Sequence, residues 1–180
     1  MRPPSSSVVL ACALVLGILG ASAVASARPA PRRGEKFEAN KTFGLGLMLG
    51  APTGLSGKYF LDGDRALDFG VGAIRYYRKR DGLHLHLDYL FHPVTLVKTE
   101  PFWLPLYLGV GGRVFDFDDD VDDDGLALGV RAPIGIAFDF NNVPLDAFFE
   151  LAVVVDFFVD YRDRVNADLN GAIGLRYYFN

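Results

Sequence analysis

The stretch 83–91, LHLHLDYLF, alternates strictly between apolar residues and a second set of different character. Odd-numbered positions carry Leu, Tyr and Phe, whereas even-numbered positions include His84, His86 and Asp88. Successive side chains of a β-strand point to opposite faces, so a period of two predicts a strand with two unlike faces. The stretch therefore predicts a strand with one apolar face and one mixed face.

The same period of two continues along the chain from Thr42, and no stretch keeps a helical period. Connections rich in Gly, Pro and Asp divide the pattern into separate runs. An even number of strands places both ends of the domain on one side, with three turns there, of which 92–101 is long, and four loops opposite. The runs cover 42–50, 54–61, 66–77, 83–91, 103–115, 126–139, 145–156 and 165–179, the predicted turns cover 62–65, 92–101 and 140–144, and the predicted loops cover 50–53, 78–82, 116–125 and 157–164.

The second face of these runs decides the class of fold. It is poor in Lys and Glu, rich in Gly, and carries isolated charges of both signs. This composition is typical of the crowded interior of a small barrel, where Gly lets the walls approach. The apolar face, with aromatic residues near the strand ends, would then meet lipid. A barrel must close in lipid, because an open edge leaves backbone groups unsatisfied.

We therefore predict an all-β fold: a single closed antiparallel up-and-down β-barrel, eight-stranded and transmembrane, over residues 42–180. The strand count could differ by two. The alternative is a soluble lipocalin-like barrel, apolar inside and polar outside, which would place many charges on the wrong face.

The first 27 residues have the pattern of a secretory signal peptide. Arg2 supplies a positive start, residues 8–20 form a short apolar run, and Ala25-Ser26-Ala27 gives the small-x-small cleavage pattern. The apolar run is too short for a comfortable transmembrane helix, which needs roughly 20 apolar residues. A lipoprotein acylated at Cys12 is the alternative. The pattern predicts export to the outer membrane of a Gram-negative-type bacterium.

Composition limits the function classes that fit the remaining chain. Residues 28–41 are rich in Pro and Arg and are predicted to form a flexible lead-in with little to bury. The sole cysteine lies in the leader, so no disulfide framework is expected. The chain has 18 Lys and Arg against 22 Asp and Glu, a balance that argues against nucleic acid as a partner. No motif indicates a cofactor.

The charges on the mixed face form the main candidate site. In a lumen of low dielectric such groups must pair, or each costs several kcal/mol in lost solvation. We predict that they pair and fill a lumen too narrow for a pore. A narrow channel or a pocket for a small polar ligand is the alternative. The predicted network contains Lys58, Asp68, Asp88, Arg113, Arg131, Asp139, Asp146, Glu150 and Arg176, with Asp156 and Asp168 as further carboxylates on the same face.

His84 and His86 are the second candidate, since both share a face with Asp88. One imidazole could act as a general base oriented by a carboxylate. A nucleophile is missing from any recognisable motif, because Ser56 is the only serine after the leader. Two imidazoles spaced by two residues are also a weak metal pattern without a third ligand. We predict lumen histidines without a catalytic role, and keep a lipid-active enzyme as the weakest hypothesis.

The acidic loop Asp116–Gly125 is the third candidate. Asp120, Asp122 and Asp124 match the opening of an EF-hand calcium loop. The match then fails, because position twelve would be Arg131, where a bidentate Glu is required. We predict a solvated run of charges, with loose cation binding that could bridge lipopolysaccharide as the alternative.

Several patterned segments resemble small outer-membrane barrels of the OmpA/OmpX type and an uncharacterised bacterial family of such barrels. They are GLMLGAPTGLSGKY (46–59), HLHLDYL (84–90), GVRAPIG (129–135), PLDAFFE (144–150) and GLRYYF (174–179). The resemblance spans nearly the whole chain after the leader, and it implies fold and location rather than an activity. The aromatic C-terminal strand resembles the signal recognised by the barrel-insertion machinery, although Asn180 displaces Phe179 from the last position. The expected partners are outer-membrane lipid, lipopolysaccharide and that machinery, and the expected state is a monomer.

Overall fold

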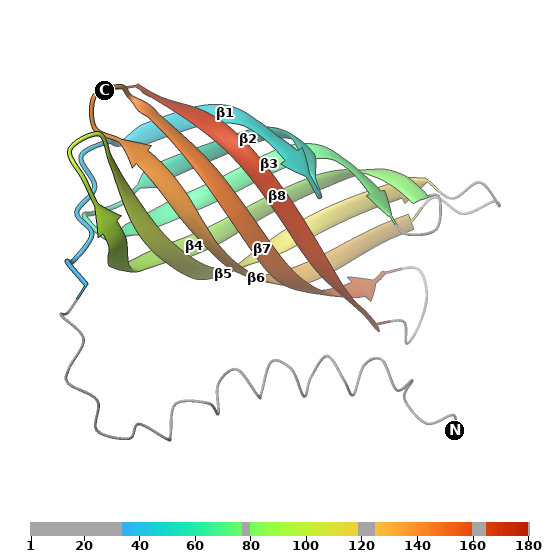
Figure 1. Ribbon diagram of the computed structural model, residues 1–180. Helices are drawn as coiled ribbons and strands as arrows, with labels where there is room; N and C mark the ends of the chain where they lie inside the picture. The colour runs from blue at the N-terminus through green and yellow to red at the C-terminus, as the bar shows by residue number, and fades with distance from the viewer. Residues whose placement is uncertain (1–33, 77–79, 119–124, 160–164, 180) are drawn as a thin grey trace, which may run out of the picture.

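The computed structural model describes residues 34–76, 80–118, 125–159 and 165–179, so the predicted signal peptide lies outside the described residues. The described chain forms eight antiparallel strands that close into a barrel, which confirms the predicted fold class (Figure 1). The strands are β1 (Phe43–Gly50), β2 (Thr53–Phe60), β3 (Arg65–Tyr76), β4 (Arg80–Lys98), β5 (Phe102–Asp118), β6 (Gly125–Phe140), β7 (Leu145–Phe158) and β8 (Val165–Phe179). Within these ranges, no helix is long and apolar enough to cross a membrane.

Each strand pairs with its neighbours in chain order, and β1 pairs with β8 to close the ring. This seam runs from the pair Phe43–Phe179 to the pair Gly50–Ala172. The start of β1 and the end of β8 therefore lie at one end of the barrel, which we call the terminal end; the opposite end is the loop end. In Figure 1 the segment that precedes β1 also lies at the terminal end.

The strand bounds agree with the predicted runs to within three residues except at the end of β4. Parts of the predicted loops 78–82, 116–125 and 157–164 are strand, because β4 begins at Arg80, β5 continues to Asp118 and β7 continues to Phe158. Residues 92–101 were predicted to form an inner turn, and this prediction is wrong, because β4 continues to Lys98 and only 99–101 connect it to β5. The register of β4 against β5 shifts between Phe91 and Val94 and again between Thr95 and Val97. An extra residue at a bulge breaks the alternation of faces, so the period of two that marks a strand is lost here.

Two tight turns show why particular residues are needed between strands. Gly50 ends β1 with a φ of 134°, a conformation that favours glycine, and a β-carbon there would collide with the carbonyl oxygen of Gly171. Between β2 and β3 the Asp62 carboxylate accepts hydrogen bonds from the backbone N–H groups of Asp64 (3.1 Å) and Arg65 (2.9 Å). The hydrogen bond from Asp64 holds the pKa of Asp62 below its usual value.

The two faces of the wall have opposite character, and β6 shows the alternation most clearly. Along β6 every second residue from Gly125 to Asp139 is buried, and most residues between them are exposed. The buried set includes Arg131 and the exposed set includes Val130 and Ile134. Charged residues therefore face the lumen and apolar residues face outward, which is the reverse of the soluble lipocalin-like alternative.

Candidate functional site

The structure places the nine charged residues of the predicted network on the inner face of the wall, and all nine side chains are buried. They come from seven strands, β2 to β8, so no single segment of sequence contains the site. Three arginines organise most of the contacts. The nine are Lys58, Asp68, Asp88, Arg113, Arg131, Asp139, Asp146, Glu150 and Arg176.

Arg176 of β8 joins three strands at one level of the lumen. Its Nη2 donates to Asp68 Oδ1 at 2.6 Å, its Nε donates to Ser56 Oγ at 2.8 Å, and its Nη1 lies 3.7 Å from Asp146 Oδ2. The guanidinium carbon lies 3.8 Å from the ring centre of Phe148. A planar guanidinium can bind carboxylates and stack on a ring at once, which a lysine ammonium cannot do.

Arg131 of β6 forms a second cluster across the lumen. Its Nε donates to Asp88 Oδ2 at 2.8 Å and its Nη2 donates to Glu150 Oε1 at 2.5 Å. The other Glu150 oxygen accepts a hydrogen bond from the Tyr107 hydroxyl at 3.2 Å. Asp88 lies on β4 and is not on a neighbouring strand, so this contact crosses the barrel interior rather than the sheet.

Arg113 of β5 forms the cluster nearest the loop end. Its Nε donates to Asp156 Oδ1 at 2.8 Å, and its Nη2 donates to the other carboxylate oxygen. This is a two-point pair, the geometry that suits Arg and carboxylate. With its amide turned to satisfy both neighbours, Asn170 accepts from Arg113 Nη1 at 2.8 Å and donates to Asp168 Oδ2 at 2.9 Å.

Lys58 is held differently from the three arginines. Its ammonium lies 3.1 Å from His92 Nε2, 4.7 Å from the ring centre of Tyr107 and 5.1 Å from that of Phe60. Within the part of the chain that the structure describes, no carboxylate lies within ion-pair distance of it. Sequence reasoning missed His92 because it placed this residue in a turn, whereas the buried imidazole lies in the extended part of β4.

The two histidines of the enzyme hypothesis are buried and in contact with each other. His84 Nε2 lies 2.9 Å from His86 Nδ1, and His86 Nε2 lies 3.8 Å from Asp68 Oδ2. The Ser56 hydroxyl accepts a hydrogen bond from Arg176, which ties it to the ion-pair cluster. Among the described residues, no group of three or more His, Cys, Asp or Glu is arranged to hold a metal ion.

Residues 34–41 lie across the terminal end, and we call them the strap. Phe37 is 1% exposed, and its ring stacks on His92 at 5.0 Å between ring centres. Phe60 and Trp103 pack around the same ring at 5.9 and 6.4 Å. The strap therefore brings an aromatic side chain into the terminal end of the lumen.

Backbone hydrogen bonds fix the strap to the end of β4 and to the turn between β2 and β3. The N–H of Thr95 donates to the carbonyl of Glu35 at 3.0 Å, and the N–H of Ala39 donates to the carbonyl of Gly63 at 2.8 Å. The prediction that residues 28–41 have little to bury is thus wrong for the described part, residues 34–41. The one apolar side chain that matters there, Phe37, has no periodic neighbours in the sequence and so gave no signal.

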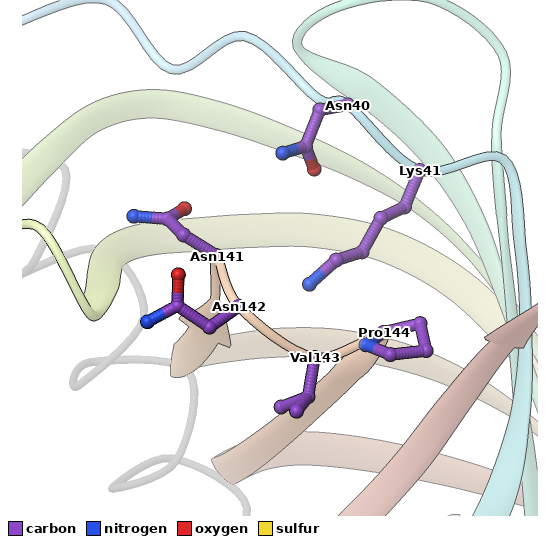
Figure 2. Close-up of a pocket in the computed structure, with 6 residues that line it drawn as sticks. All are labelled: Asn40, Lys41, Asn141, Asn142, Val143 and Pro144. Atoms are coloured by element: carbon purple, nitrogen blue, oxygen red, sulfur yellow. The ribbon is translucent and has the colours of Figure 1, made fainter.

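Lys41 closes the strap against the turn between β6 and β7. Its ammonium donates to Asp139, to the carbonyl of Phe140 at 2.8 Å and to the carbonyl of Leu145 at 3.1 Å. Figure 2 shows this side chain reaching from the strap towards that turn. A polar pocket of about 220 Å³ lies beside it, lined by Asn40, Lys41, Asn141, Asn142, Val143 and Pro144. Because Lys41 and Asn141 are already bound to backbone carbonyls, these polar groups fasten the terminal end.

The described residues at the loop end of the lumen include an apolar cluster. Ile74, Phe115 and Ala127 form a buried cluster, and Ala51 and Phe158 pack against it. The charged clusters therefore lie between an aromatic layer at the terminal end and an apolar layer at the loop end. The sequence did not reveal this layering, since it depends on which strand ends meet in space.

The acidic loop of the third hypothesis is largely outside the described residues. Asp120, Asp122 and Asp124 fall in 119–124, for which no placement is described. Asp116, at the start of that run, lies on β5 and is exposed. The cation-binding prediction therefore stays a prediction.

Comparison with known proteins supports the fold. The sequence matches no protein-family model, and it matches no curated protein. A solved structure is similar: the N-terminal β-barrel domain of Pseudomonas aeruginosa OprF. The TM-score is 0.55 at 16% sequence identity, over 76% of this chain and 96% of that domain. The structural superposition shows a shared barrel fold, and at this low identity it shows the fold alone.

Proposed function

We propose that this chain is an integral outer-membrane β-barrel, monomeric and non-enzymatic, with a structural or surface-interacting role and a lumen closed by ion pairs. The observation that carries the proposal is the reversal of the two faces. Buried charges point inward on β2 to β8, while half-exposed Leu, Ile, Val and Phe side chains point outward. A water-soluble protein rarely exposes an apolar surface that continues around the molecule.

Aromatic residues on the outer face support a membrane boundary at the terminal end. Phe43 pairs with Tyr59 on one side and Phe179 on the other, and its ring stacks on Phe179 at 6.2 Å and on Phe69 at 6.4 Å. Tyr177 packs edge-on against Phe179 at 5.1 Å. Rings of this kind gather at the interface of outer-membrane barrels, where an apolar body meets lipid and one edge meets water.

Three layers favour a closed lumen over a channel: the strap, the arginine clusters and the apolar cluster at the loop end. Each of the three arginines is bound to at least one carboxylate on another strand, so opening a path requires breaking buried ion pairs. A narrow polar path is the second candidate. It is favoured by buried polar atoms without a hydrogen-bond partner in the described structure, among them Asp88 Oδ1, Asp146 Oδ1, Arg131 Nη1, Arg176 Nη1 and His84 Nδ1.

A non-enzymatic role fits the burial of the groups that could do chemistry. His84 is fully buried and His86 is 3% exposed, so neither imidazole meets a substrate without a rearrangement of the wall. We also propose export through the predicted leader 1–27, contact with outer-membrane lipid and lipopolysaccharide, and insertion by machinery that recognises β8. The aromatic outward residues of β8, Tyr177 and Phe179, support the last of these.

The test is to purify the exported protein in detergent and to compare unheated with heated samples on a denaturing gel. A membrane barrel resists unfolding without heat, so we expect two mobilities. The same protein is then placed in planar lipid bilayers, where we expect no stable conductance steps. A chain that stays monomeric in water without detergent contradicts the membrane assignment. Stable steps would instead support the narrow path and overturn the closed lumen.

A further inference from the structure

The outer face of the wall has a hollow of about 440 Å³ at Gly112 of β5. Gly112 faces outward, and its partners in the sheet are Leu87 on β4 and Val130 on β6. An absent side chain between two large ones leaves a gap in the apolar surface. The outward side chains around the gap are Phe69, Leu85, Leu87, Val114 and Leu128, and His86, Arg113 and Gly129 belong to the wall beneath it.

Gly112 differs from the other outward glycines of the strands in that no described residue covers it. A β-carbon at Gly112 would meet no atom nearer than the Gly129 carbonyl oxygen, at 3.6 Å. At Gly57 the ring of Phe69 already occupies that space, and at Gly171 a methyl of Leu151 lies at 3.3 Å. The hollow at Gly112 is thus an open site on the surface, and not a gap that neighbouring side chains fill.

The chemistry of the hollow fits hydrocarbon. Its outward walls are Leu, Val and Phe side chains, and Leu87 and Leu128 are themselves 56% and 48% exposed. The two polar residues beneath it, His86 and Arg113, are each 3% exposed, and both are bound to partners within the lumen. Water in such a hollow would find few polar partners, whereas hydrocarbon would gain dispersion contacts on several sides.

The position of the hollow indicates which part of a lipid would reach it. Asp116 lies two residues beyond Val114 on the same face of β5 and is exposed. A strand rises about 3.3 Å per residue, so the hollow begins only a short distance below this charged position. Its depth corresponds to the upper part of a hydrocarbon chain in the leaflet at the loop end.

We propose that the hollow at Gly112 seats one acyl chain of a membrane lipid. This inference rests on the proposed function, because the hollow must face the bilayer. The hollow is continuous with the apolar outer face, and the seated chain completes that surface where the side chain is missing. The barrel thereby holds one lipid longer than the lipids around the rest of the wall.

The test uses Gly112→Leu. The new side chain would occupy the hollow, and its β-carbon would fit without a clash. Ala132→Leu is the matched control, since Ala132 is exposed on the outer face of β6 but does not line the hollow. Each protein is folded into vesicles of dioleoyl phosphatidylethanolamine and phosphatidylglycerol, extracted in mild detergent and weighed by native mass spectrometry. We expect one retained lipid for the wild type and for Ala132→Leu, and none for Gly112→Leu.

Equal lipid retention by all three proteins overturns the inference. A mass shift from dimer to monomer on Gly112→Leu, with no change in bound lipid, also overturns it and assigns the hollow to a contact between two copies. Heat-dependent gel mobility of all three proteins is recorded in parallel. If the wild type shows no heat-dependent mobility, the proposed membrane function is contradicted. If it shows heat-dependent mobility but all three proteins retain lipid equally, only the acyl-chain site is contradicted.

Discussion

The side chains on the inner and outer faces of β6 make different kinds of contact although they belong to one strand. On the inner face, Arg131 binds carboxylates of β4 and β7, so its contribution depends on residues far away in the sequence. On the outer face, Ile134 is 51% exposed and makes its main contact with whatever surrounds the barrel. We therefore expect substitutions in the lumen to be strongly coupled to one another, and substitutions on the outer face to act nearly independently.

The largest effect is expected from Arg176→Ala in the lumen. It leaves Asp68 and Asp146 buried without their cation, and breaking a buried pair in this way costs about 3–5 kcal/mol. Urea titration of the free energy of unfolding in vesicles measures the loss. Combining Arg176→Ala with Asp68→Asn should recover part of it, because the uncompensated charge is removed. A loss below about 1 kcal/mol would mean that ion pairs in the lumen contribute no more to stability than solvent-exposed ion pairs do.

A charge on the outer face should cost less, and for a different reason. On the proposed function Ile134→Arg would place a guanidinium in hydrocarbon, and such a change near the bilayer midplane of a barrel costs about 2–4 kcal/mol. The same urea titration applies, with Ile134→Leu as a control that keeps the face apolar. If Ile134→Arg unfolds at the wild-type urea concentration, this face does not meet lipid.

Two adjacent tyrosines test the comparison within one strand. Tyr178 points inward and its hydroxyl donates to Asp146 at 2.6 Å, while Tyr177 points outward and is 49% exposed. Tyr178→Phe removes a hydrogen bond to a charged group, which is worth about 1.5–3 kcal/mol. Tyr177→Phe should change the free energy of unfolding by less than about 0.5 kcal/mol. Equal losses at the two positions would remove the distinction between the faces.

Among the charge pairs, the smallest effect is expected for one that lies at the exposed surface and outside the lumen. Lys98 and Glu35 pair at 2.6 Å, with side chains 38% and 62% exposed. Exposed pairs contribute about 0.2–1 kcal/mol, so Lys98→Ala should lie in that range and weaken further with added salt. A double-mutant cycle with Glu35→Ala measures the pair directly. A coupling as large as that of Arg176 with Asp68 would show that pairing strength does not follow burial.

The sequence was sufficient for the fold wherever alternation is uninterrupted. The run 83–91 and β6 show the period of two without a break, and their inward charges follow from the sequence alone. The signal failed at His92, because the bulges that follow Phe91 shift the phase of the pattern. It failed at Phe37 because a single buried ring in an irregular segment has no period.

Pairing partners were also beyond the sequence pattern. Arg131 and Asp88 are 43 residues apart and lie on strands that are not neighbours. The pattern shows that both face inward, but the height and tilt of each strand decide whether they meet. The hollow at Gly112 could not be predicted for the same reason, since the alternation places this glycine on the outer face but does not show whether neighbouring side chains fill the space beside it.

The seam between β1 and β8 also has a consequence for how the barrel folds. It joins residues 43–50 to residues 172–179, so its contacts have nearly the greatest sequence separation in the domain. Each hairpin can form locally, whereas ring closure must wait until β8 has been made and brought back to β1. Until then both strands present unpaired edges that can template association with another chain. The interval between synthesis of β1 and closure of the seam is therefore the period in which these two edges are open to pairing with another chain.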